Sequence, residues 1–313
     1  MKILITGGFG YVGGRLAEHL VGCGHKVYLG TRAFQNPPEK IKECSVRSMA
    51  WHDRDSLLTS CESIDVVIHA AGLNAKECFD NPKMAEEVNG IATKWLVDSA
   101  SQQQVSNFIY LSTAHVYSDN LSGSINEKSP TANTHPYAAS NLMGEHAVID
   151  GHSVNGMRTI VVRLANSFGA PSRQSVDCWT LVVNDFCRQA AESGKIAIRG
   201  PSNVVRNFIT ISDVCRAIEL LSSSSLSLET SLICNLGDKT KTLFGIASAI
   251  REIYLEERCL PIDIIKIRDD FPDVQHLDFQ SSALSRMNFQ PCSNFKEELR
   301  SLIEFCENEF GGY

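Results

Sequence analysis

The chain has 313 residues, of which 43% are hydrophobic and 21% charged, a composition typical of a globular protein with one large domain or a core domain and a smaller lobe. The formal net charge of −7, without a lysine and arginine stripe, argues against a nucleic-acid partner. No apolar run is as long as a membrane span and no signal-peptide pattern precedes the first strand, so we expect a cytoplasmic protein without a membrane partner.

Residues 1–14 predict a strand, a glycine-rich turn and the start of a helix. Residues 3–5 are apolar, as in a buried strand of a parallel sheet, and a helical run follows at 15–21. Between them Gly7, Gly10 and Gly13 recur at every third position. Such glycines permit a tight turn and let the backbone approach a pyrophosphate at the helix N-terminus. A glycine-rich turn without a ligand is the alternative.

The residue that follows the second predicted strand, at 25–30, selects the dinucleotide. An acidic residue there would bind the ribose 2′-hydroxyl of NAD. Here the strand is followed by Thr31 and Arg32, and an arginine can pair with a 2′-phosphate. We therefore favour NADP, with NAD as the second choice. A solvated loop arginine is the alternative interpretation of Arg32.

The strand predicted at 65–72 ends in small residues, Ala70 and Ala71, which leave room for a ligand at the carboxyl edge of the sheet. His69 precedes them, and a core histidine is at least as good an interpretation as a functional one. A helix is expected over 84–100, with Asn89 on the face that supports the end of the next strand.

Two further segments, Phe-Ile-Tyr-Leu-Ser-Thr-Ala-His-Val-Tyr at 108–117 and Tyr-Ala-Ala-Ser-Asn at 137–141, carry a family resemblance. Together with the glycine spacing they resemble the extended short-chain dehydrogenase/reductase family of nucleotide-sugar epimerases, dehydratases and reductases. Segments 161–169 and 206–214 also resemble family motifs, so the resemblance covers nearly the whole chain.

These features predict an α/β fold, a doubly wound parallel sheet of the Rossmann type with a smaller C-terminal substrate lobe. We expect the dinucleotide-binding domain at 1–165, with return segments near 204–237, and a discontinuous substrate lobe mainly at 166–313. The family members are often dimers, so the resemblance also implies a homodimer as one option.

The resemblance implies roles for single residues. Thr113 would hold the substrate oxygen and Tyr137 would exchange a proton with it, while Asp53 matches a carboxylate that contacts adenine in related proteins. Asn166 lies where a strand ends, a usual place for substrate, and the planar fork of Arg206 suits a diphosphate, with a surface ion pair as the alternative. The candidate cofactor-binding residues are Gly7, Gly10, Tyr11, Val12, Gly13, Arg32, Asp53, Ala70, Ala71 and Asn141.

Asn141 departs from the family pattern, which has lysine at this position. The lysine holds the nicotinamide ribose and lowers the pKa of the tyrosine, whereas Asn141 can bind a hydroxyl but brings no charge. Because the free phenol has a pKa of about 10, Tyr137 should be neutral near pH 7, a proton donor and a poor base. Reduction of a keto-sugar therefore fits better than a reaction that begins with proton removal. A cofactor-binding protein with weak or no catalysis is the alternative.

A 4,6-dehydratase fits less well. The dehydratases of the family that this chain resembles have the motif Thr-Asp-Glu at the catalytic strand, whereas here Ala114 and His115 follow the threonine. A structural or solvated histidine is the favoured interpretation of His115.

The 11 cysteines form no C-x-x-C pair and suit reduced thiols better than disulfides or a zinc site, so we expect no metal. The expected partner is a nucleotide-activated sugar, whose sugar and base the sequence leaves open.

Overall fold

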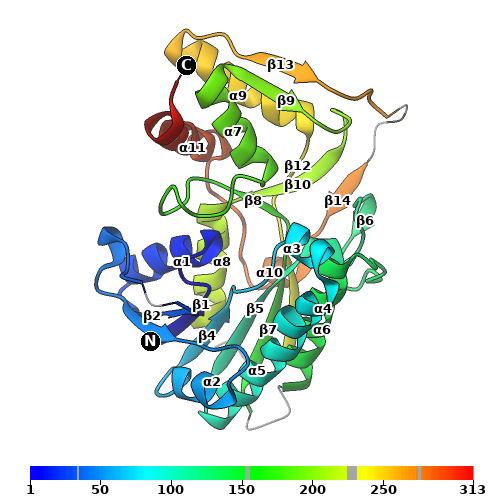
Figure 1. The fold of residues 1–313 in the computed structure, drawn as a ribbon. Coiled ribbons are helices and arrows are strands. Elements are labelled where there is room, and N and C mark those ends of the chain that lie inside the picture. Colours follow the sequence, from blue (N-terminus) through cyan, green and yellow to red (C-terminus); the bar gives the residue numbers. More distant parts are fainter. Residues whose placement is uncertain (34, 152–155, 224–230, 272, 274–275, 313) are drawn as a thin grey trace.

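The computed structural model describes residues 1–33, 35–151, 156–223, 231–271, 273 and 276–312. Its central feature is a seven-stranded sheet in which neighbouring strands are parallel, with the order β11-β7-β5-β4-β1-β2-β3 (Figure 1). This is the doubly wound α/β fold that the sequence predicted. The strands are β1 (Lys2–Thr6), β2 (Lys26–Thr31), β3 (Ser45–Ser48), β4 (Val66–His69), β5 (Asn107–Thr113), β7 (Arg158–Leu164) and β11 (Ser231–Leu236).

The strand order reverses between β1 and β4, since the chain builds outward in one direction from β1 to β3 and in the other from β4 to β11. In open α/β sheets a ligand binds at such a switch point, at the carboxyl ends of the strands. The glycine-rich turn after β1 and the small residues after β4 both lie there. The topology therefore places the predicted cofactor residues at one edge.

Helices cover both faces of the sheet because successive side chains of a buried strand point to opposite faces. In β1, Ile3 and Ile5 pack into the core that contains α1 and α8, while Leu4 packs into the core on the other face, with α2 and α5. All three side chains are fully buried. The covering helices are α1 (Tyr11–Gly22), α2 (Arg54–Ser60), α5 (Ala92–Gln102), α6 (Pro136–Gly151) and α8 (Ile211–Ser223).

The helix expected over 84–100 is not regular. It consists of α4 (Pro82–Ala85), a π-helical segment at Glu86–Ile91, and α5. A side chain added at Gly90 would lie 3.0 Å from the Met143 side chain of α6, so the two helices approach closely at the π-helical segment. Such segments often occur at functional sites, and this one contains the buried Asn89.

A second hydrophobic core lies among three helices and small sheets drawn in the upper part of Figure 1. Its sheets have the orders β12-β10-β8 and β13-β9, and a further pair, β14-β6, lies between this region and the large sheet. The division into domains at residues 165 and 166 stays a prediction. The elements are β6 (Gly123–Ile125), β8 (Asn166–Phe168), β9 (Lys195–Ile198), β10 (Val205–Thr210), β12 (Lys239–Thr242), β13 (Asp263–Lys266), β14 (Leu277–Phe279), α7 (Val182–Ser193), α9 (Leu243–Arg258) and α11 (Phe295–Phe310).

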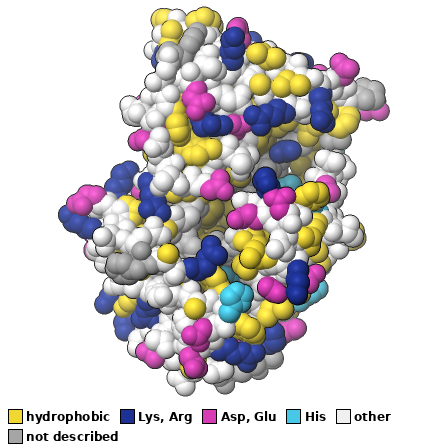
Figure 2. All heavy atoms as spheres, in the orientation of Figure 1, with side chains coloured by type: hydrophobic (Ala, Val, Ile, Leu, Met, Phe, Trp, Pro, Cys, Tyr) yellow, Lys and Arg dark blue, Asp and Glu magenta, His cyan; other side chains and the backbone are white. Residues whose placement is uncertain are grey.

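The remaining helices are the short α3 (Ala75–Asp80) and α10 (Ser282–Arg286). On the face drawn in Figure 2, the described acidic and basic side chains are interspersed rather than gathered in a stripe of one sign. Within the described ranges, none of the helices combines the length and the apolar character that crossing a bilayer requires.

Candidate active site

The glycine-rich turn has the geometry of a phosphate-binding turn. Gly7 has φ of +66°, a conformation that side chains disfavour, and the Gly10 N–H donates to the Gly7 carbonyl at 2.8 Å. A Cβ at Gly13 would lie 2.2 Å from the same carbonyl oxygen, so only glycine lets α1 pack this close. The N-cap of α1 is Gly10, which has no capping side chain, and the first N–H groups of the helix are left for a ligand.

Tyr11 uses its side chain within the protein. Its hydroxyl donates to the Gly169 carbonyl at 3.1 Å, and burial raises the pKa of this phenol well above its usual value. Arg15, one turn further along α1, donates to the Ala170 carbonyl at 2.5 Å. These bonds hold the segment that follows β8 against the glycine-rich turn. Because the Tyr11 side chain is used in this way, cofactor binding through the main-chain N–H groups of Tyr11 and Val12 stays a prediction.

The candidates for the adenosine half of the cofactor lie around the ends of β2 and β4. Arg32 is exposed directly after β2, and Ala70 and Ala71 adjoin Gly7, whose added Cβ would be 3.0 Å from both. Asp53 is the N-cap of α2, where its carboxylate accepts the Asp55 and Ser56 N–H groups. This capping bond gives Asp53 a structural role beside the predicted one.

Sequence reasoning missed a second arginine at this edge, Arg173. Its Nη2 donates to the Gln35 side chain at 3.1 Å and to the Phe9 carbonyl at 3.4 Å, and its guanidinium lies over the Phe9 ring. Phe9 belongs to the glycine-rich turn, and Gln35 follows Arg32 in the loop after β2. No local pattern in the sequence connects Arg173 with residues so far away along the chain.

His69 is a structural histidine. It is 2% exposed, and its two ring nitrogens lie 2.6 Å from the Thr6 hydroxyl and 2.9 Å from the Thr93 hydroxyl. Burial lowers its pKa to about 3, so the ring is neutral. Asn89 supports the segment after β4 and helix α6, since its amide accepts the Leu73 N–H at 2.9 Å and donates to Ser140 at 3.1 Å; support of the end of β5 stays a prediction.

The structure brings Thr113 and Tyr137 together. Thr113 ends β5 and Tyr137 lies in the first turn of α6, and the Thr113 side chain is close enough to affect the pKa of Tyr137. Burial raises the pKa of Tyr137, and Thr113 only partly offsets this effect. The His115 ring lies beside Tyr137, with 6.5 Å between ring centroids. Burial and the nearby Arg206 cation lower the pKa of His115, so it too is neutral near pH 7.

Asn141 is held inside the protein, one helical turn after Tyr137. It is 7% exposed, its Oδ1 accepts the Tyr110 hydroxyl at 3.0 Å, and its Nδ2 donates to the Tyr137 carbonyl at 2.8 Å. Tyr110 belongs to β5 and is buried. Burial raises the pKa of Tyr137, Thr113 lowers it and Cys78 raises it, so no cation among the described residues contributes. Position 141 thus holds a neutral amide that β5 keeps in place.

A buried ion pair lies one further turn along α6. Glu145 and Arg163 approach to 2.6 Å, and Ser112 donates to Glu145 at 2.5 Å. Arg163 also donates to the Tyr117 hydroxyl at 3.0 Å. The network joins β5, α6 and β7. The spacing of four between positions 137, 141 and 145 was the signal in the sequence that could have revealed it.

The two substrate candidates lie on paired strands of the second core. Asn166 on β8 donates to the Asn207 carbonyl of β10 at 2.9 Å, so its amide positions these strands. Arg206 on β10 is half-buried, and desolvation lowers its pKa. Among the residues that the structure describes, no carboxylate pairs with Arg206, which leaves a partly desolvated cation next to His115. Such a cation suits an anionic ligand.

Comparisons with known proteins agree with this geometry. The dTDP-glucose 4,6-dehydratase of Streptomyces niveus is 24% identical over 235 residues, which are 71% of this chain and 68% of that protein. The crystal structure of a Thermotoga maritima UDP-glucose 4-epimerase with UDP-glucose superposes with a TM-score of 0.82 at 19% identity, over 98% of this chain and 99% of that one. A Thermus thermophilus UDP-glucose 4-epimerase in complex with NAD gives 0.81 at 20% identity, over 99% and 100%. The profile of the NAD dependent epimerase/dehydratase family matches residues 3–237, and the chain therefore belongs to this family.

Proposed function

We propose that the protein is an NAD(P)-dependent oxidoreductase or epimerase acting on a nucleotide-activated sugar, and that it favours reduction of a keto-sugar. The residues present fit a dinucleotide, because Gly7 and Gly13 keep the turn after β1 free of side chains at the switch point of the sheet. Reduced nicotinamide supplies hydride when it is bound. The protein would contribute orientation and the proton.

The observation that carries this proposal is the neutral environment of Tyr137. Burial raises the pKa of its phenol, and Asn141 adds no charge where a cation would lower it. A protonated phenol can give its proton to the oxygen of a ketone as the carbonyl carbon is reduced, whereas removal of a hydroxyl proton needs the phenolate. The Thr113 hydroxyl, which is close enough to affect the same phenol, would hold that oxygen.

Arg206 supports a nucleotide diphosphate as the activating group. Its guanidinium is partly desolvated without a carboxylate partner in the described ranges, and His115 next to it is neutral. A diphosphate would supply charge and hydrogen-bond acceptors to the planar fork. Two relatives of known structure, an epimerase with UDP-glucose and one with UDP-glucuronic acid, carry ligands of this class in their own sites.

Two arginines support NADP as the preferred cofactor. Arg32 is exposed directly after β2, and Arg173 reaches the same loop through Gln35. Both could pair with a 2′-phosphate, which NAD lacks. NAD is the second choice, since the epimerase of Thermus thermophilus was solved with it.

The test is a titration of the purified protein with NADPH and NADH, followed by a panel of nucleotide 4-keto sugars while oxidation of the nicotinamide is monitored. The proposal expects NADPH to bind more tightly and to be oxidised in the presence of one class of keto-sugar. Light scattering on the same sample tests the expected homodimer. Binding without oxidation across the panel would contradict the reductase.

A second candidate, a cofactor-binding protein with weak or no catalysis, is favoured by one observation. The Asn141 side chain already bonds Tyr110 and the Tyr137 carbonyl, which leaves at most one of its N–H groups for a ribose and provides no charge. Asn141→Lys separates the two candidates. If the variant creates hydride transfer that the native protein lacks, the second candidate holds; if it damages an existing activity, Asn141 belongs to an adapted enzyme.

A further inference from the structure

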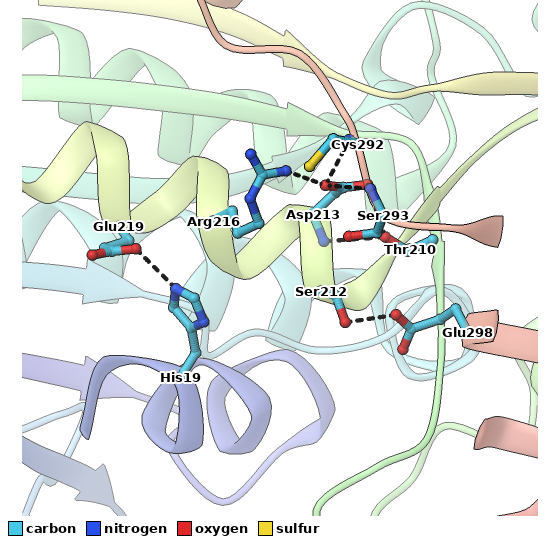
Figure 3. Close-up of polar contacts among 9 residues, drawn as sticks. All are labelled: His19, Thr210, Ser212, Asp213, Arg216, Glu219, Cys292, Ser293 and Glu298. Carbon is cyan, nitrogen blue, oxygen red and sulfur yellow. Dashed lines mark hydrogen bonds and ion pairs between the residues drawn. The ribbon is translucent and has the colours of Figure 1, made fainter. Parts of the chain in front are cut away.

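Helices α1 and α8 bring together three side chains that can bind a metal, His19, Cys23 and Glu219, which we call the His19 cluster. The His19 Nε2 lies 3.0 Å from a Glu219 carboxylate oxygen and 3.7 Å from the Cys23 sulfur. The three ligand atoms all lie within 4.8 Å of one another. Figure 3 shows His19 on α1 pointing at Glu219 on α8.

Two of these separations, 3.0 Å and 3.7 Å, are near those between ligands of a tetrahedral zinc ion. With zinc bonds of about 2.0–2.1 Å to nitrogen and oxygen and about 2.3 Å to sulfur, neighbouring ligand atoms are about 3.3–3.6 Å apart. His19 and Cys23 are four residues apart on one helix and so share a face. The carboxylate comes from the separate helix α8, and its distance from the Cys23 sulfur is within 4.8 Å.

The surroundings of the cluster also favour a cation. The Glu219 carboxylate is negatively charged and lies beside both His19 and Cys23. Water is the candidate for a fourth ligand. The His19 and Glu219 side chains are 27% and 33% exposed, so an ion can reach the site.

We propose that His19, Cys23 and Glu219 form a binding site for a zinc-like transition-metal ion, with water in the fourth position. The ion would join α1, which begins at the glycine-rich turn, to α8, which follows β10. On binding, the thiol proton is released to solvent and the thiolate sulfur coordinates the metal. The site involves neither Thr113 nor Tyr137, so it stands or falls independently of the function proposed above.

The first experiment measures binding of Zn²⁺ to the untagged, reduced protein by calorimetry, with Co²⁺ as a spectroscopic probe. We expect one equivalent of Zn²⁺, an affinity that rises with pH as the thiol proton is displaced, and a thiolate-to-Co²⁺ charge-transfer band. Absence of saturable Zn²⁺ binding at pH 8 would overturn the proposal.

Single substitutions identify the ligands. Cys23→Ser should abolish the charge-transfer band, and Cys23→Ser, His19→Ala and Glu219→Gln should each weaken Zn²⁺ binding by at least about tenfold. Cys259→Ser is the matched control, because Cys259 is also an exposed free thiol but ends α9, and it should leave binding unchanged. Unchanged thermal melting of the apo variants shows that they are folded. Binding that survives all three substitutions, or that is lost only in Cys259→Ser, would overturn the assignment.

Discussion

Replacing Asn141 by lysine tests the idea that a neutral amide keeps Tyr137 protonated. In the native protein burial raises the pKa of Tyr137 above its usual value, and no cation in the described part of the chain offsets this rise. A cation within about 4–6 Å of an acidic group lowers its pKa by about 1–3 units. Reduction uses the protonated phenol. The rate of reduction should therefore be full at pH values below the pKa of Tyr137 and should fall as the pH rises through that pKa.

The assay is the pH dependence of kcat for keto-sugar reduction between pH 6 and pH 10. The native enzyme should stay active up to about pH 9, whereas in Asn141→Lys the alkaline loss of activity should move down by about 1–3 pH units. Asn141→Met is the matched control, because it has a similar length without the charge and should keep the native profile.

Both variants remove the Asn141 oxygen, which accepts a hydrogen bond from the buried Tyr110 hydroxyl. Leaving such a group without a partner costs about 1–3 kcal/mol in both proteins, and Asn141→Lys also buries a charge at a 7% exposed position, so it should be the less stable of the two. The alkaline shift of the pH profile should appear in Asn141→Lys alone. The same alkaline limb in Asn141→Lys and Asn141→Met, or a native enzyme that loses activity near pH 7, would refute the reasoning.

Three further substitutions address the substrate, the cofactor and the fold. Arg206→Gln should raise the KM for a nucleotide-diphosphate sugar about 10–100-fold, the equivalent of about 1.5–3 kcal/mol for bonds to a charged group, with unchanged cofactor affinity in the same titration. Arg32→Ala should weaken NADPH binding at least about tenfold and leave NADH binding nearly unchanged; equal losses for both would remove the argument for NADP. Glu145→Gln leaves the buried Arg163 without its counter-charge and should lower the free energy of unfolding by about 3–5 kcal/mol in urea titrations, so a loss below 1 kcal/mol would contradict a buried pair.

The parts of the site that depend on local pattern could be predicted from the sequence. The apolar run before Gly7 and the glycine spacing give the strand, the turn and the helix of the first βαβ unit, because each residue there is constrained by its immediate neighbours. The contact between Thr113 and Tyr137 followed from the family resemblance, which places the end of one strand near the start of a helix.

Contacts between distant parts of the chain were not predictable in this way. The Tyr110 hydroxyl donates a hydrogen bond to the Asn141 side chain, and only the packing of β5 against α6 brings these two residues together. Arg173 reaches the glycine-rich turn from beyond β8, and no periodicity marks it. The π-helical segment at 86–91 also escaped prediction, because a helical pattern does not reveal one inserted residue per turn.

The most direct test of the account compares native protein with Tyr137→Phe in the oxidation of NADPH by nucleotide 4-keto sugars. The account predicts that the native protein oxidises one NADPH for each sugar reduced and that Tyr137→Phe, with unchanged NADPH affinity, is slower by at least about 100-fold, as expected for loss of a general acid. Equal rates in the two proteins, or NADPH bound without oxidation across the panel, would contradict the claim that Tyr137 is the proton donor of a reductase.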